Sequence, residues 1–135
     1  MCGIIGINSS KPVSSTILNS LKKLEYRGYD SAGIATLFNG SINEVKSEGR
    51  VNNLEKNSIV QKMEGTIGIG HVRWATHGIP NTLNAHPHST DQVSVVHNGI
   101  IENSDEIKKE IENKGFKFKS QTDTEVITLL ITEAL

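Results

Sequence analysis

The sequence predicts a single α+β domain in which short strands alternate with amphipathic helices. The chain has 135 residues, a length that suits one domain with a sizeable core. Strand and helix patterns follow one another without a linker, a repeat or a low-complexity stretch. Asn39-Gly40 separates two strand-like runs, and this dipeptide is the strongest short-range signal for an antiparallel hairpin.

The first half of the chain is expected to contribute most of the strands. An apolar run at its start indicates a buried strand, and apolar residues at helical spacing after Pro12 indicate a helix. The expected elements are a strand over 3–8, a helix carrying Val13, Ile17, Leu21 and Leu24 on one face, strands over 32–38 and 41–47, a helix over 51–63 and a strand over 66–73.

The second half begins with a long loop over 74–92, and a loop of that length inside a domain is usually functional or disordered. The elements expected after it are a strand over 93–97, a helix from Ser104 that stops at Gly115, a strand over 116–120 and a last helix capped by Thr122 or Asp123. This last helix reaches Leu135 with its apolar stripe unfinished. We therefore expect the chain to be the front part of a longer protein.

Composition excludes several classes of partner. The net charge is −1 and the lysines are scattered, so electrostatics give no reason to expect nucleic acid. No apolar run approaches the ~20 residues of a membrane span, and the pattern of a signal peptide is missing. The single cysteine cannot form an internal disulfide, so a cytoplasmic location is expected.

That single cysteine, Cys2, directly follows the initiator Met1. If Met1 is removed, one residue carries both a thiol nucleophile and an α-amine, which is partly neutral at cellular pH and can take the thiol proton. The alternative is a small buried residue at the start of a strand.

Two segments carry more chemistry than a plain turn requires. The connection over 26–33 combines Arg27, Gly28 and an aspartate between a helix and a strand. At the end of the strand over 66–73, Arg73 can hold a carboxylate in a bidentate manner and Trp74 can shield it from water. The alternative is a surface charge beside a tryptophan that fills the core.

Three further positions have a chemical and a structural interpretation. Asn98 and the Gly99 N–H could form an oxyanion hole, although Asn-Gly is also a common hairpin turn. Asp123 could face an ammonium group, although capping of the last helix would also explain it. His86-Pro87-His88 suggests zinc, but no standard ligand spacing is present, so hydrogen bonds that tie down the loop are favoured.

Taken together, the segments resemble the class II glutamine amidotransferase domain, and the resemblance runs from residue 2 to the end of the chain. Within that family, the segments over 26–31 and 73–78 are most similar to the branch that aminates fructose 6-phosphate. The matching segments are Met1-Cys2-Gly3-Ile4, residues 26–33, 71–78, 85–88, 96–103 and 122–125.

The resemblance implies a four-layer αββα sandwich of the N-terminal nucleophile hydrolase type. It also implies that Cys2 attacks the side-chain amide of L-glutamine through a thioester, giving glutamate and ammonia without a metal or an organic cofactor. The roles that it implies are oxyanion stabilisation by Asn98 and Gly99, a wall around the nucleophile from Arg27 and Gly28, glutamine binding by Arg73, Thr76, His77, Gly99 and Asp123, gating of ammonia by Trp74 and loop support by His86.

The chain departs from that family in length. The glutaminase domain of the family continues past the position that matches Leu135, and the sugar isomerase domains that would use fructose 6-phosphate are absent. We therefore expect residues 1–135 to be a partial, truncated glutaminase domain with open sheet edges that favour a homodimer or aggregation. Three alternatives stay open, namely an inactive, partly folded fragment, a glutaminase domain of another class II amidotransferase and a histidine-rich metal-binding module.

Overall fold

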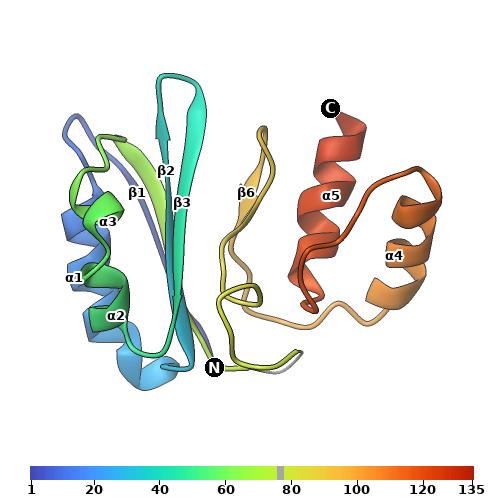
Figure 1. Cartoon of the computed structure of the whole chain (residues 1–135), viewed down its shortest axis with the longest axis horizontal. Helices are drawn as coiled ribbons and strands as arrows, with labels where there is room; N and C mark the ends of the chain where they lie inside the picture. Colours follow the sequence, from blue (N-terminus) through green and yellow to red (C-terminus); the bar gives the residue numbers. More distant parts are fainter. Residues whose placement is uncertain (76–77) are drawn as a thin grey trace.

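The fold is a stack of four layers (Figure 1). The computed structural model describes residues 1–75 and 78–135. Helices α1, α2 and α3 cover the outer face of a four-stranded antiparallel sheet, and the small sheet of β5 and β6 lies on its other side. Helix α5 packs against this small sheet, and α4 packs against α5. The predicted order of helix, sheet, sheet and helix is therefore present.

The four-stranded sheet is built entirely from the first half of the chain. Its strand order is β1-β4-β2-β3, so β1 and β3 form the edges. At the predicted hairpin, Asn39 and Gly40 have φ of 50° and 76°, the left-handed conformation that such a turn requires. The strands are β1 (Gly3–Asn8), β2 (Ser31–Phe38), β3 (Ser41–Glu48) and β4 (Ile67–Arg73).

Helix α1 (Ser14–Leu24) packs on this sheet through the predicted apolar face. Ile17 and Leu21 are fully buried. The close approach depends on glycines in β4, since a Cβ on Gly70 would lie only 2.5 Å from a methyl group of Ile17. Burial of such side chains contributes roughly 1.5–3 kcal/mol each, so this contact helps to hold the first two layers together.

The single helix predicted over 51–63 is wrong, because the chain forms two short helices there. They are α2 (Val51–Glu55) and α3 (Ser58–Gln61). Asn57 separates them, and its side chain accepts a hydrogen bond of 2.9 Å from the Ile59 N–H, which caps α3. A short polar side chain thus starts a new helix where the apolar pattern alone suggested continuation.

The second half has less β structure than the sequence predicted. The strand expected over 116–120 is absent, because the Lys119 and Ser120 N–H groups donate to the carboxylate of Glu125 instead of to a neighbouring strand. The elements present are β5 (His88–Ser89), β6 (Ser94–Val95), α4 (Ser104–Asn113) and α5 (Thr124–Ala134). Gly115, with φ of 94°, follows the end of α4 as predicted.

The helices of the described residues are short. The longest, α1 and α5, have 11 residues each. Within residues 1–75 and 78–135, no helix is long and apolar enough to cross a membrane.

Candidate active site

Cys2 lies at the end of the four-stranded sheet because of the pairing between β1 and β4. Gly3 is opposite Val72, so the register places Cys2 beside Arg73, the last residue of β4, and next to Trp74, which follows it. The Trp74 N–H donates a hydrogen bond of 3.2 Å to the Cys2 Sγ, and the Sγ lies 3.6 Å from the Trp74 carbonyl oxygen. The thiol is thus held by main-chain groups and is partly exposed.

Arg27 and Gly28 lie behind Cys2, at the end of a 3₁₀ turn over Glu25–Arg27. The Arg27 Nε donates to the Cys2 carbonyl oxygen at 3.0 Å. A Cβ on Gly28 would lie 2.5 Å from the Arg73 carbonyl oxygen and 2.7 Å from the Trp74 nitrogen. Glycine is therefore required here so that the connection can pass against the main chain that holds the thiol.

Asn98 lies against the main chain of Cys2. Its Oδ1 is 3.4 Å from the Cys2 N–H that donates to it, and its Nδ2 donates to the Cys2 carbonyl oxygen at 3.4 Å. Asn98 and Gly99 lie in the connection from β6 to α4, so the hairpin alternative is wrong. An amide side chain therefore stands next to the main chain of Cys2, and Gly99 lines the same cavity.

Arg73 and Asp123 are buried charged residues of the same region. Arg73 is 3% exposed, donates to the carbonyl oxygens of Gly78 and Ile79 at 3.4 and 3.2 Å, and lies 3.8 Å from Asp30. Asp123 occupies the N-cap position of α5, yet its side chain makes no capping hydrogen bond. Its carboxylate accepts a hydrogen bond of 2.8 Å from the Ile101 N–H instead, so capping does not explain it.

A cavity of about 340 Å³ connects these groups, a volume in the range of small-molecule sites. Of the residues predicted from the sequence, Cys2, Arg73, Trp74, His86, Asn98, Gly99 and Asp123 line it. Arg27 and Gly28 support Cys2 from outside the cavity. Thr76 and His77 lie outside the described residues. The remaining lining residues are Met1, His97, Ile100, Thr122 and Thr124.

Buried histidines join the two sheets behind the cavity. The rings of His71 and His86 stack with centroids 4.1 Å apart, and His88 meets His86 edge-on at 4.8 Å. The His71 Nε2 lies 3.2 Å from the His97 carbonyl oxygen, while the His86 Nδ1 accepts from the His97 N–H at 3.4 Å. Two imidazoles thus hold the peptide groups on either side of His97, one residue before Asn98.

The histidines are uncharged near neutral pH. Burial lowers the pKa of His71 to about 4 and the pKa of His88 to about 3, and it also lowers the pKa of His86. The neighbouring Arg73 opposes protonation of all three rings as well. His86 therefore ties the loop over 74–92 to the main chain that follows β6, through a hydrogen bond to its uncharged imidazole.

The zinc interpretation has no geometric support in the described part of the chain. Among residues 1–75 and 78–135, no three histidine, cysteine, aspartate or glutamate side chains converge in a way that could hold a metal ion.

The sequence did not single out Asp30, His97 or Thr124. Asp30 was visible only as the aspartate within the crowded segment over 26–33. The His97 Nδ1 lies 3.2 Å from the Thr124 Oγ1, which connects the approach to Asn98 with the start of α5. This contact joins residues 27 positions apart, and no local pattern signals it.

Comparison with known proteins finds relatives along the whole chain. A family profile for the glutamine amidotransferase domain matches residues 55–134. The chain is 52% identical over 133 residues to the glutamine–fructose-6-phosphate aminotransferase [isomerizing] of Agrobacterium fabrum. The matched region covers 98% of this chain and 22% of the relative. The enzyme of the same name from Mesorhizobium japonicum is 53% identical over 135 residues, all of this chain and 22% of the relative. The chain thus spans about a fifth of the length of these relatives.

Solved structures with the same arrangement include the glutamine phosphoribosylpyrophosphate amidotransferase from B. subtilis complexed with ADP and GMP. It has a TM-score of 0.82 and 28% identity, over 98% of this chain and 29% of the other. A structure described as the allosteric regulatory enzyme of purine biosynthesis has a TM-score of 0.85 at 28% identity, with the same coverage. The predicted N-terminal nucleophile hydrolase sandwich is confirmed. The chain belongs to the glutamine amidotransferase family.

Proposed function

We propose that this chain hydrolyses the side-chain amide of L-glutamine, with Cys2 as the nucleophile, and releases glutamate and ammonia. The observation that carries the proposal is the single cavity shared by a thiol, an amide donor and two buried groups of opposite charge, Arg73 and Asp123. Each of these groups matches one part of a glutamine molecule: its amide carbon, the oxygen on that carbon, its α-carboxylate and its α-ammonium.

The first step requires removal of Met1, so that the Cys2 nitrogen becomes an α-amine. This amine takes the proton from the thiol, and the sulfur attacks the amide carbon. The tetrahedral intermediate collapses as the amine returns the proton to the leaving nitrogen, which departs as ammonia. Water then attacks the γ-glutamyl thioester, releases glutamate and restores the thiol. The side chain of Asn98, which accepts from the Cys2 nitrogen, would orient the amine.

The oxyanion of the intermediate would be stabilised by the Asn98 Nδ2 and the Gly99 N–H. In this structure Nδ2 lies next to Cys2, where the new C–O⁻ group would form. A donor of this kind is worth roughly 10²–10³ in rate because it is already oriented before charge develops.

Glutamine would be held by its two charged ends. Arg73 would bind the α-carboxylate and Asp123 the α-ammonium, and Thr76 and His77 would complete the pocket. Both charged groups are already fixed by main-chain hydrogen bonds, so they do not need to reorganise when the substrate binds.

We propose further that residues 1–135 are part of a glutaminase domain whose ammonia serves an acceptor elsewhere in a longer protein. The names of the relatives favour fructose 6-phosphate as that acceptor. Trp74, which borders the cavity and is 51% exposed, would gate the passage of ammonia.

The test is glutamate release from glutamine by the purified chain, after intact-mass analysis has shown that Met1 is absent. Turnover that is lost in Cys2→Ala supports the proposal. A chain that lacks Met1, melts cooperatively and still releases no glutamate would contradict it and favour the inactive fragment.

A further inference from the structure

The two peptide groups that flank Trp74 both contact the sulfur of Cys2. The peptide between Arg73 and Trp74 donates its N–H to the Sγ at 3.2 Å. The peptide between Trp74 and Ala75 presents its carbonyl oxygen 3.6 Å from the Sγ, where it accepts from the S–H. The direction of the thiol therefore depends on the orientation of these two peptide planes.

Asp30 forms hydrogen bonds with both of these peptide groups, on the side opposite to the Cys2 sulfur. In a trans peptide the N–H and C=O groups point in opposite directions. The Asp30 N–H donates to the Arg73 carbonyl oxygen at 3.3 Å, on the far side of the first peptide. The Asp30 Oδ2 accepts from the Ala75 N–H at 2.6 Å, on the far side of the second. Asp30 and Cys2 thus lie on the two sides of the Trp74 main chain, and each contacts both peptides.

Asp30 is itself fixed. Its Oδ1 accepts from the Ser31 Oγ at 3.0 Å and lies 3.8 Å from an Arg73 nitrogen, and its carbonyl oxygen accepts from the Gly49 N–H at 2.8 Å. Ser31 begins β2 and pairs directly with Arg73 of β4. The carboxylate is therefore anchored to the paired ends of β2 and β4, whereas Cys2 lies just before the first strand.

We propose that Asp30 is a positioning residue for the nucleophile, which aims the Cys2 sulfur by fixing the two peptide groups of Trp74. This role rests on the proposed function of Cys2, but it concerns the thiol itself and can be measured without glutamine. The Trp74 N–H supports negative charge on the sulfur as it attacks, so loss of Asp30 slows every reaction of that sulfur with an electrophile.

The experiment compares Asp30→Ala with Asp30→Asn. Asparagine keeps an oxygen that accepts from the Ala75 N–H, whereas alanine removes it. The readouts are the rate constant for alkylation of Cys2 by iodoacetamide, followed by intact mass, and the kcat and KM for glutamine. In Asp30→Ala we expect alkylation and kcat to fall by roughly 10²-fold, the cost of a misplacement of about 1 Å, with little change in KM. Asp30→Asn restores most of both rates.

Glu48→Ala is the matched control, because Glu48 is an exposed acid that pairs in register with Ser31 at the same end of the sheet. It should react like the parent chain. If Asp30→Ala does not melt cooperatively, Asp30→Glu takes its place, since it keeps the charge but displaces the acceptor by one bond, and it should also slow alkylation.

Alkylation at the parent rate in Asp30→Ala or its glutamate substitute overturns the inference, as does a loss of rate that asparagine does not restore. Slowed alkylation in a series in which even the parent chain releases no glutamate upholds the role of Asp30 and counts against the proposed function alone.

Discussion

At the scale of single residues, the candidate site depends on short polar groups that are held by backbone atoms. Asn98 contacts the main chain of Cys2 on one side, and Arg27 does so on the other. Asp123 contacts the Ile101 N–H, and Arg73 contacts the carbonyl oxygens of Gly78 and Ile79. Because backbone groups move little, the site is largely formed before a substrate enters.

Replacement of Asn98 tests the oxyanion hole proposed above. Asn98→Ala removes the Nδ2 donor and also the Oδ1 that accepts from the Cys2 nitrogen, while the main-chain contacts of Arg73 and Asp123 stay in place. We expect kcat for glutamine hydrolysis to fall by roughly 10²–10³-fold with KM changed little, because the donor acts on charge that develops in the transition state. Steady-state kinetics on the chain without Met1 provide the check, and a loss confined to KM would argue for a role in substrate binding instead.

Replacement of Gly28 tests the wall behind the nucleophile. In Gly28→Ala the new methyl group would meet the Arg73 and Trp74 main chain at 2.5–2.7 Å, so that backbone must shift. We expect a loss of roughly 1–3 kcal/mol in the free energy of unfolding, as for other overpacked sites, together with lower activity. Gly6→Ala in β1 is the control, because the nearest atom to its new methyl group lies 3.9 Å away. Equal urea midpoints for the two variants would contradict the steric argument.

At the scale of elements, the sequence predicted structures whose signals are local. The hairpin at Asn39-Gly40, strand β1, helix α1 and the end of α4 near Gly115 are all present, since each depends on turn chemistry or on apolar periodicity within a few residues. The errors arise where polar side chains redirect backbone hydrogen bonds. Asn57 starts α3, and Glu125 takes the N–H groups that a strand over 116–120 would have used.

The residues of the candidate site were predicted from the sequence, but its supports were predicted only in part. Cys2, Arg73, Asn98, Gly99 and Asp123 were identified because their segments resemble those of a known family, and the cavity brings them together. Asp30 was not singled out, because its importance comes from contact with the Arg73–Ala75 backbone, which no sequence period reveals.

The buried histidines between the two sheets, His71, His86 and His88, predict how the free energy of unfolding depends on pH. The pKa of His71 is lowered from its ordinary value of 6.5 to about 4 by burial. As the pH falls below about 6.5, the unfolded chain binds protons that the folded chain refuses, so the free energy of unfolding decreases until the pH reaches the folded pKa. His88, with a pKa of about 3, acts in the same direction.

We therefore expect urea unfolding to give a lower free energy at pH 5.5 than at pH 7, above the range in which most carboxylates titrate. His71→Leu should show a smaller decrease between these two pH values, since it removes one of the groups responsible. Free energies that do not differ between pH 7 and pH 5.5 would show that the histidines are not buried in the neutral form.

At the scale of the whole molecule, the space between the two sheets is open on the side away from the candidate site. A cavity of about 210 Å³ lies between the first sheet and β6. Leu37 and Ile67, which face each other across β2 and β4, border it and are 41% and 44% exposed. Exposed apolar side chains that lie together at one end of a sheet favour association between chains.

We expect the purified chain to associate with itself as its concentration rises, measured by sedimentation velocity. The pair Leu37→Glu and Ile67→Lys replaces the apolar contact with an ion pair and should shift the chain toward the monomer. Ile59→Lys on α3, where the side chain is 60% exposed on the outer helical layer, is the control and should not do so. A parent chain that remains monomeric at all concentrations would refute the predicted homodimer.

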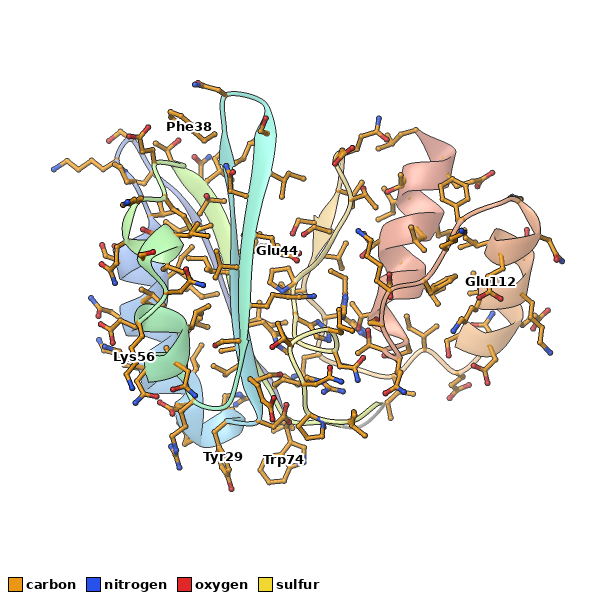
Figure 2. All side chains as sticks on the ribbon, viewed as in Figure 1. Tyr29, Phe38, Glu44, Lys56, Trp74 and Glu112 are labelled. Atoms are coloured by element: carbon orange, nitrogen blue, oxygen red, sulfur yellow. The ribbon has the colours of Figure 1, made fainter. Side chains whose placement is uncertain are left out.

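The main chain and the side chain of Trp74 lie in different surroundings. Its main chain is fixed by Asp30 on one side and the thiol on the other. The residue is 51% exposed, and its indole meets the Tyr29 ring edge-on, with ring centroids 6.4 Å apart (Figure 2). Rotation about the side-chain bonds of Trp74 leaves the peptide planes where they are. The gating of ammonia proposed for Trp74 would therefore leave in place the two peptide groups that hold the Cys2 sulfur.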